Sequence, residues 1–209
     1  MSSANENRIE LAIVDYGLGN QTSLQSSCRQ LGHRAVISNQ PEVLDKARIL
    51  LLPGVGAFPT AMANLHRLDL VDYLHQASQQ CRGILGICLG MQLLTERSNE
   101  LEPCTGLGLI PGETVPLSQS RWHIGWNNLE IQQNCPLLMP CDGDVMYFNH
   151  SFCYSGPDEY IVAVSRLQPV DEPIVAAIQR EHLIGLQFHP EKSQQLGLRL
   201  LNRAIHSLL

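Results

Sequence analysis

Residues 83 to 92 read Gly83-Ile84-Leu85-Gly86-Ile87-Cys88-Leu89-Gly90-Met91-Gln92, an apolar run that ends at a cysteine between two glycines. Residues 83–87 are typical of a buried central strand, and residues 89–95 suit a helix. The pattern Gly-Ile-Cys-Leu-Gly matches the G-x-S-x-G signature of a sharp strand-to-helix turn, with Cys88 in the place of serine. Side chains at positions 86 and 90 would collide in so tight a turn. The sequence therefore predicts a nucleophile at Cys88, presented on such a turn.

Strand-like and helix-like runs alternate through the first half of the chain. The predicted strands are residues 9–15, 35–37 and 48–52, in addition to 83–87. Leu24, Cys28 and Leu31 form one face of a helix that stops at Gly32, and further helices are predicted at 57–65 and 70–80. This alternation predicts an α/β fold, a mostly parallel open sheet flanked by helices on both faces.

The second half contains shorter strand-like pieces separated by Pro, Gly, Asn and Asp. They lie at Glu113, 122–131, 145–148 and 160–167, and residues 174–179 and 183–188 could form a hairpin. Apolar residues at 198, 201, 205 and 208 have helical spacing and predict a C-terminal amphipathic helix. No linker is visible, so we expect a single domain over 1–209 with additional antiparallel strands in its second half.

Composition excludes several classes of function. The chain has 209 residues, 44% of them hydrophobic, and a formal net charge of -6 without any Lys/Arg cluster, so neither bulk disorder nor nucleic-acid binding is expected. The polar N-terminus lacks the features of a signal peptide, and no apolar stretch approaches the roughly 18 residues of a membrane helix. The seven cysteines form no C-x-x-C pair, which argues against a disulfide framework and a zinc site. We expect reduced thiols, no metal, no cofactor and a cytoplasmic location.

The position of Cys88 has chemical consequences. A thiol at a helix N-terminus lies at the positive end of the helix dipole, which favours the thiolate. The backbone N–H of Leu89 points into the same space and can form one half of an oxyanion hole. The alternative is a buried structural cysteine, which is the interpretation we give the other six.

A candidate base and its orienting group lie in His189-Pro190-Glu191, at the end of the last strand-like run. Glu191 can accept the second ring N–H of His189, and Pro190 limits the backbone between them. Five other histidines have no partner pattern and are interpreted as solvated side chains without a role: His33, His66, His75, His182 and His206. The roles of His123 and His150 stay open at this point.

Together these motifs resemble those of the class I (triad-type) glutamine amidotransferases, through Gly86 to Gln92 and His189-Pro190-Glu191. Four further segments narrow the resemblance to the glutaminase subunits of imidazole glycerol phosphate synthase, of histidine biosynthesis: Tyr16-Gly17-Leu18-Gly19-Asn20, Pro53-Gly54-Val55-Gly56-Ala57-Phe58, His123-Ile124-Gly125-Trp126-Asn127 and Tyr147-Phe148-Asn149-His150-Ser151. The resemblance runs from about residue 15 to residue 192.

The resemblance implies that Cys88 attacks the side-chain amide of glutamine, with His189 and Glu191 completing a catalytic triad. A γ-glutamyl thioester would form, ammonia would leave and water would release glutamate. Backbone N–H groups of Val55 and Leu89 would form the oxyanion hole. Contacts to glutamine are implied for Gly54, Gly56, Gln92, Glu100, His150 and Ser151. A solvated acid at a helix end is an equal alternative for Glu100.

The resemblance also implies a partner, a separate (β/α)8 cyclase that forms a heterodimer with this chain. The cyclase would receive the ammonia and make imidazole glycerol phosphate and AICAR. The expected docking residues are Asn20, Trp126, Tyr147 and Lys192, although Trp126 and Tyr147 could equally be core aromatics. The chain departs from the family pattern at Trp122, Asn149 and Phe152, which leaves details of docking and of the substrate pocket open.

Three alternatives remain at this level. The chain could be another glutaminase of the same class, although the Gly-Trp-Asn and Tyr-Phe-x-His-Ser segments argue against it. It could be a catalytically dead binding module on the same scaffold, which the intact Cys88, His189 and Glu191 disfavour. It could be a cysteine peptidase, which would need a long open groove for its substrate.

Overall fold

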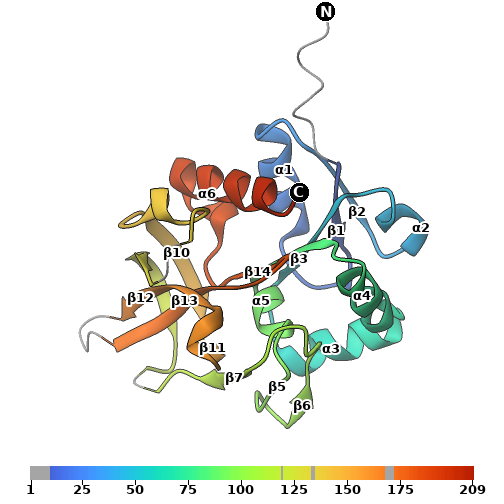
Figure 1. Cartoon of the computed structure of the whole chain (residues 1–209). Helices are drawn as coiled ribbons and strands as arrows, with labels where there is room; N and C mark the ends of the chain where they lie inside the picture. Colours follow the sequence, from blue (N-terminus) through green and yellow to red (C-terminus); the bar gives the residue numbers. More distant parts are fainter. Residues whose placement is uncertain (1–9, 119, 133–134, 168–171) are drawn as a thin grey trace, which may run out of the picture.

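The computed structural model of the chain describes residues 10–118, 120–132, 135–167 and 172–209. Its largest sheet has the strand order β2-β1-β3-β4-β14-β13-β12-β9 (Figure 1). The first five strands in this order are parallel: β2 (Arg34–Ser38), β1 (Glu10–Val14), β3 (Ile49–Gly54), β4 (Gly83–Cys88) and β14 (Leu183–Leu186). Every residue of β3 and β4 is buried, which explains their unbroken apolar runs. The predicted parallel core is confirmed, and its predicted first residue, Ile9, lies outside the described residues.

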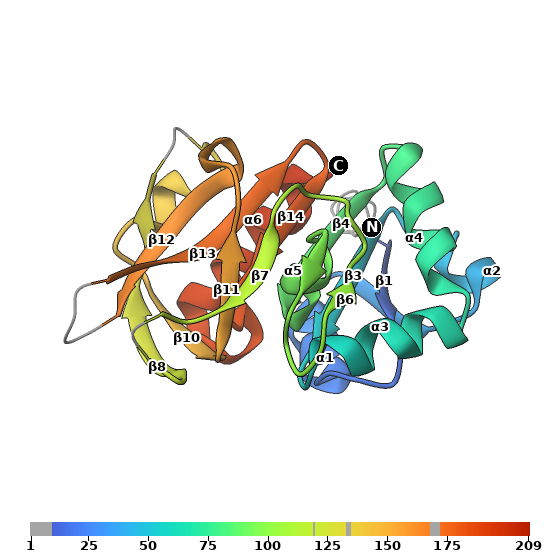
Figure 2. The same cartoon turned by 90° about the horizontal axis from the view of Figure 1, so that it is seen from below.

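The strands of the second half extend this sheet and form two smaller ones (Figure 2). The predicted hairpin pairs β13 (Glu172–Arg180) with β14, and β12 (Ile161–Leu167) and β9 (Glu130–Ile131) continue the sheet in antiparallel fashion. One small sheet pairs β8 (His123–Asn128) with β10 (Val145–His150). The other contains β11 (Phe152–Ser155), β7 (Glu113–Pro116), β5 (Arg97–Ser98) and β6 (Cys104–Thr105).

Helices cover both faces of the parallel sheet. Alternate strand residues point to opposite faces, so Leu11 and Ile13 join one core with α1 (Gln21–Gln30) and α6 (Gln194–Ser207). Ala12 and Val14 join the other core with the helices α3 (Phe58–Arg67), α4 (Leu70–Gln79) and α5 (Leu89–Leu93). The remaining helical segments are short: α2 (Pro41–Leu44), η1 (Met139–Cys141), η2 (Asp158–Tyr160) and η3 (Pro190–Lys192).

The segment 122–131, predicted as one strand-like piece, is divided between two sheets. Leu129 is buried, its N–H donates to the carbonyl of Asp144, and its carbonyl accepts from the N–H of Gly143. These bonds to a neighbouring turn replace the strand ladder at Leu129. The chain therefore leaves the small sheet after Asn128 and joins the large sheet at Glu130.

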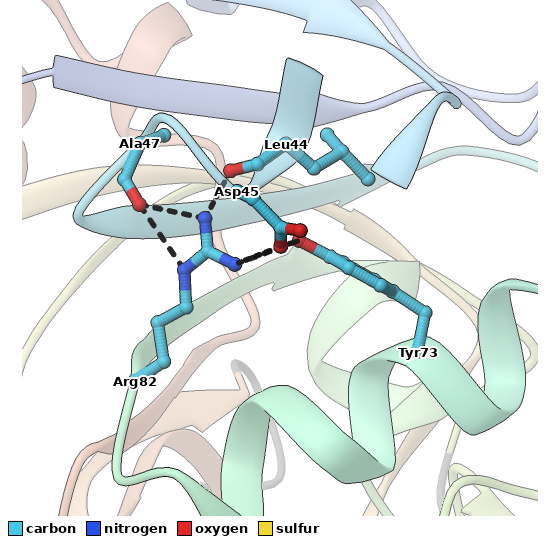
Figure 3. A network of polar contacts seen from close by, with 5 residues as sticks. All are labelled: Leu44, Asp45, Ala47, Tyr73 and Arg82. Carbon is cyan, nitrogen blue, oxygen red and sulfur yellow. Dashed lines mark hydrogen bonds and ion pairs between the residues drawn. The ribbon is translucent and has the colours of Figure 1, made fainter. Parts of the chain in front are cut away.

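Arg82 fastens the connection between α2 and β3 to the beginning of β4 (Figure 3). Its guanidinium donates to the carbonyls of Leu44 and Ala47, and Nη1 donates to Asp45 at 3.3 Å and to the hydroxyl of Tyr73 at 2.7 Å. The Arg82 side chain is only 13% exposed. The planar guanidinium thus satisfies the last carbonyl of α2 and one in the connection that follows, and holds both beside α4.

We expect Arg82→Lys to destabilise the fold without changing the site chemistry. A single ammonium cannot reproduce the fork of hydrogen bonds, so the free energy of unfolding should fall by roughly 2 kcal/mol. Denaturant unfolding measures this change, and Arg34→Lys, at a mostly exposed ion pair with Glu10, is the matched control. Equal free energies of unfolding for Arg82→Lys and Arg34→Lys would contradict this stabilising role of Arg82.

Candidate active site

Cys88 lies at the turn where β4 ends and α5 begins, at the carboxyl edge of the parallel strands. Its φ is 55°, in the left-handed region that residues other than glycine rarely occupy. An added Cβ at Gly86 would lie 2.6 Å from the carbonyl oxygen of Gly90, and one at Gly90 would overlap the carbonyl of Leu52. The expected sharp turn is therefore present, and backbone from β3 and α5 fills the space beside both glycines.

His189 follows β14 at the same edge of the sheet and pairs with Glu191. Its Nδ1 lies 2.9 Å from Oε1 of Glu191, and the two side chains are only 3% and 4% exposed. The N–H of His189 donates to the carbonyl of Tyr147 at 2.9 Å, and the hydroxyl of Ser193 donates to the carbonyl of His189 at 2.7 Å. Because a carboxylate only accepts, Glu191 keeps a proton on Nδ1 and leaves Nε2 as the reactive nitrogen.

The charge state of His189 depends on its two neighbours. Burial disfavours the imidazolium, but Cys88 and Glu191 outweigh burial and raise the pKa of His189 to about 9. Nε2 is buried and has no hydrogen-bond partner among the described residues. A thiol, an imidazole that binds a proton strongly and a carboxylate that orients the imidazole are the parts of a cysteine-based nucleophilic triad.

A cavity of about 220 Å³ opens beside Cys88. It is lined by most of the residues expected in the oxyanion hole or at the substrate: Val55, Gly56, Leu89, Gln92, Glu100, His150 and Ser151. Asn149 and Phe152, two of the three departures from the family pattern, also line it. Gly54 instead packs against Tyr16 and Leu89, where an added Cβ would overlap the Tyr16 hydroxyl. The loop after β3, the start of α5 and the end of β10 therefore meet at one small pocket.

Glu100 and His150 also make hydrogen bonds within the protein. Oε2 of Glu100 accepts from the N–H of Phe58, at the beginning of α3, at 2.8 Å. The Nδ1 of His150 lies 2.7 Å from the carbonyl of Phe152, and its Nε2 lies 3.0 Å from Nδ1 of His123. The bond to Phe58 uses one of the two carboxylate oxygens of Glu100, whereas both ring nitrogens of His150 are engaged.

The expected docking residues lie within β8 and β10, in η3 and at the start of α1. Trp126 on β8 lies opposite Tyr147 on β10, with ring centroids 5.6 Å apart, and the Tyr147 ring lies 6.4 Å from that of His189. Trp126 is 48% exposed, so it is a surface rather than a core aromatic. Lys192 ends η3, and the side chain of Asn20 accepts from the N–H of Ser23 at the start of α1. Asn20 therefore already has a role as a helix cap.

Two sequence interpretations need correction. His33, interpreted as solvated, is 4% exposed, and its Nε2 lies 2.8 Å from the side-chain oxygen of Asn202 on α6. Its burial follows from α6 packing against the turn after α1, a contact between distant parts of the chain. Of the six cysteines interpreted as buried, Cys28, Cys135 and Cys141 are buried, Cys104 and Cys153 are half-buried and Cys81 is exposed. Cys81 follows the last turn of α4, which faces solvent.

The sequence interpretation assigned no role to Gln187 and none to the Tyr16 side chain. Gln187 is fully buried, and its Nε2 lies 3.9 Å from Sγ of Cys88. Its spacing of two from His189 could have identified it, because alternate residues of an extended segment point to the same side. Tyr16 donates to the carbonyl of Pro53 at 2.5 Å, and burial and the nearby Cys88 raise its pKa.

The described residues offer neither a group of three or more His, Cys, Asp and Glu that could hold a metal ion nor a helix long and apolar enough to cross a membrane.

Comparisons with known proteins agree with one another. The family described as glutamine amidotransferase class-I matches residues 12–206. The imidazole glycerol phosphate synthase subunit HisH of Lactococcus lactis is 39% identical over 202 residues, which cover 95% of this chain and 99% of that protein. Subunit HisH 1 of the same synthase from Campylobacter jejuni is 42% identical over 201 residues, covering 93% and 98%.

Solved structures show the same fold at low sequence identity. The structure of PurLQS from Thermotoga maritima aligns with a TM-score of 0.74 and 19% identity, covering 96% of this chain and 97% of that chain. A protein described as a putative GMP synthase subunit from Thermoplasma acidophilum aligns with a TM-score of 0.72 and 19% identity, covering 96% and 94%. These likenesses concern the fold alone.

We predict that an NMR titration of the His189 ring gives a midpoint near pH 9. The folded state favours the imidazolium, so this group stabilises the fold fully below its ordinary pKa of 6.5, and that contribution is lost as the pH rises through 9. Glu191→Gln removes the carboxylate and should move the midpoint to lower pH. The matched control is Glu181→Gln, which should leave the midpoint of His189 unchanged. Glu181 is 77% exposed and lies beside His182. An unchanged midpoint in Glu191→Gln would show that the carboxylate does not hold the imidazolium.

Proposed function

Because the chain belongs to the class I glutamine amidotransferases, and among them to the HisH subunits of imidazole glycerol phosphate synthase, we propose that Cys88, His189 and Glu191 are its catalytic triad. The chain hydrolyses glutamine to glutamate and ammonia, and the ammonia is used in histidine biosynthesis. The observation that supports the triad most strongly is the buried Glu191–His189 pair beside Cys88, and Cys88 itself lines a small cavity. The family match over 12–206 supports treating 1–209 as one glutaminase domain.

In the first half of the reaction Cys88 becomes acylated. Because its pKa is raised to about 9, His189 already holds the thiol proton at Nε2, and the thiolate Sγ attacks the side-chain amide carbon of glutamine. The tetrahedral intermediate carries its negative charge on the former carbonyl oxygen, where the N–H groups of Val55 and Leu89 can bind it. The C–N bond then breaks, His189 returns the proton to the leaving nitrogen, and ammonia departs from a γ-glutamyl thioester.

In the second half water releases glutamate. His189, again neutral at Nε2, takes a proton from a water molecule that attacks the thioester carbon. The C–S bond breaks, the proton returns to the sulfur, and Cys88 is ready for another cycle. Glu191 stays unprotonated throughout and holds the imidazole by its Nδ1–H, at 2.9 Å in this structure.

The size and polarity of the cavity support glutamine rather than a peptide as substrate. Its volume, about 220 Å³, is below the roughly 300–1,000 Å³ of pockets for drug-sized ligands. We propose that Glu100 binds the α-ammonium of glutamine and that Gly56, Gln92 and Ser151 contact the rest of it. Gly54 would act indirectly, by letting Tyr16 and Leu89 pack against the loop that contains Val55.

The chain is a subunit of a complex, and we propose that its partner is a (β/α)8 cyclase bound in a heterodimer. An apolar surface supports docking next to the site. Ile124 and Trp126 on β8 are 60% and 48% exposed, and Trp122, just before β8, is 57% exposed. Tyr147 and Lys192 extend this surface toward His189. Ammonia made at Cys88 would then enter the cyclase without passing through bulk water. We propose the cytoplasm as the location, in keeping with seven free thiols.

We predict that Cys88→Ala abolishes glutamine hydrolysis, by at least about a thousandfold, because the nucleophile is lost. The same variant, mixed with the cyclase, should still support synthesis when ammonia is supplied. Glutamate release and cyclase product formation measure the two outcomes.

The exposed Cys81 provides the matched control, since Cys81→Ala should leave both activities unchanged. Glutamate formation by Cys88→Ala at the rate of the wild type would rule out Cys88 as the nucleophile.

We further predict that the isolated chain hydrolyses glutamine slowly and that the cyclase with its ribonucleotide substrate accelerates the reaction. Lys192→Ala should weaken this activation by about tenfold, because Lys192 lies at the proposed interface. Glutamate release as a function of cyclase concentration measures the effect.

The chain has two lysines, so Lys46→Ala, distant from the site, is the natural control. Full activity of the isolated chain, or equal activation of both variants, would contradict the proposed coupling.

A further inference from the structure

The backbone carbonyl of Phe152 lies near the nucleophile and accepts hydrogen bonds from two side chains. It accepts one hydrogen bond from Nε2 of Gln92 at 3.1 Å and lies 2.7 Å from Nδ1 of His150. A carbonyl oxygen can only accept, so both nitrogens must carry a hydrogen directed at it. This single acceptor therefore sets the orientation of the Gln92 amide and the tautomer of His150.

The orientation of Gln92 determines that of Gln187. Nε2 of Gln92 also lies 3.2 Å from Oε1 of Gln187, so this second bond places the oxygen of Gln187 toward Gln92. The Nε2 of Gln187 is consequently the end that faces Cys88, at 3.9 Å from Sγ. Gln187 is fully buried, which removes water as a competing partner of its amide, and Gln92 is 5% exposed.

Two neutral histidines complete the group of residues that fixes the orientation of Gln187. With its proton on Nδ1, His150 presents a lone pair at Nε2, which accepts from Nδ1 of His123 at 3.0 Å. His123 in turn stacks on Phe148, with ring centroids 4.6 Å apart and an interplanar angle of 25°. Burial lowers the pKa of His150 to about 3, so the ring stays neutral and the tautomer is kept.

The sulfur of Cys88 therefore has a different partner for each of its protonation states. As a thiol it can donate to the carbonyl of Asn149 at 3.7 Å, and as a thiolate it can accept from Gln187. A hydrogen bond to a charged acceptor is about twice as strong as one between neutral groups, and burial increases the difference.

We propose that Gln187 donates a hydrogen bond to the thiolate of Cys88 and that Gln92, His150 and the Phe152 carbonyl hold it in that orientation. This inference rests on the proposed function, which makes Cys88 the nucleophile. It adds a hydrogen-bond donor for the thiolate that is separate from His189.

Other ionisable groups also face Cys88 and must be considered in any test by pH. His189, with Glu191 behind it, follows β14, and Tyr16 follows β1. His150 on β10 interacts electrostatically with His189. The burial of Tyr16 raises its pKa, and its hydroxyl proton is donated to Pro53, so Tyr16 stays neutral beside the sulfur.

The test is the alkylation of Cys88 by iodoacetamide in the full-length chain without glutamine, followed by peptide mass spectrometry and repeated over a range of pH. Gln187→Met keeps the length of the side chain but removes the donor. Gln187→Glu keeps the shape and replaces the donor by an acceptor. The control is Gln25→Met, whose half-buried amide donates to the carbonyl of Ala35 at 2.9 Å away from the site. Thermal unfolding verifies that each variant is folded.

We expect alkylation of Cys88 at neutral pH to slow by about tenfold in Gln187→Met and by more in Gln187→Glu. The pH at which the rate is half-maximal should rise in both variants, whereas Gln25→Met should behave as the wild type. Unchanged rates in both Gln187 variants would overturn the inference, as would an effect of Gln187→Glu alone, which would reflect charge repulsion. A wild-type Cys88 that reacts no faster than the exposed Cys81 would overturn both this inference and the proposed nucleophile.

Discussion

The turn between β4 and α5 holds Cys88 at a φ of 55°, a conformation that costs about 1–3 kcal/mol for a residue with a side chain. It persists because both flanking elements are fully buried and cannot shift to relieve it. Gly90 lies against the carbonyl of Leu52 on the neighbouring strand, so the beginning of α5 is in backbone contact with β3. The strained turn places the sulfur at the edge of the sheet. The groups that can act on it come from the strand ends at the same edge.

Neutral groups surround a single reactive ion pair at this edge. The raised pKa of His189, to about 9, favours the imidazolium, and Glu191 is the buried carboxylate that balances it. The neighbouring ionisable side chains stay neutral, since burial raises the pKa of Tyr16 and lowers that of His150. Their hydrogen bonds can therefore hold backbone and amide groups in place without competing for the proton that Cys88 and His189 exchange. A buried site of this kind strengthens each charge interaction within it.

Sequence reasoning succeeds where local pattern and tertiary structure agree. The apolar runs of β3 and β4 and the glycines around Cys88 predict the parallel core and the sharp turn, because each depends on residues close together in the chain. The short strands β5, β6 and β11 carry too few residues for a periodic pattern and form only by pairing with distant partners. The break at Leu129 is likewise fixed by a turn more than ten residues away. Gln187 is a mixed case: its spacing of two from His189 could have identified it, but the orientation of its amide is set by Gln92 and the Phe152 carbonyl, which are distant in the chain.

The central claim is that Cys88 becomes covalently attached to the γ-carbonyl of glutamine during turnover. Mass spectrometry of the chain, mixed with glutamine and the cyclase and then quenched rapidly in acid, tests it most directly. We expect a glutamyl group on the peptide that contains Cys88, at a level that rises and then holds steady while glutamate accumulates. Steady glutamate formation with no adduct at Cys88, or with an adduct on another residue, would contradict it.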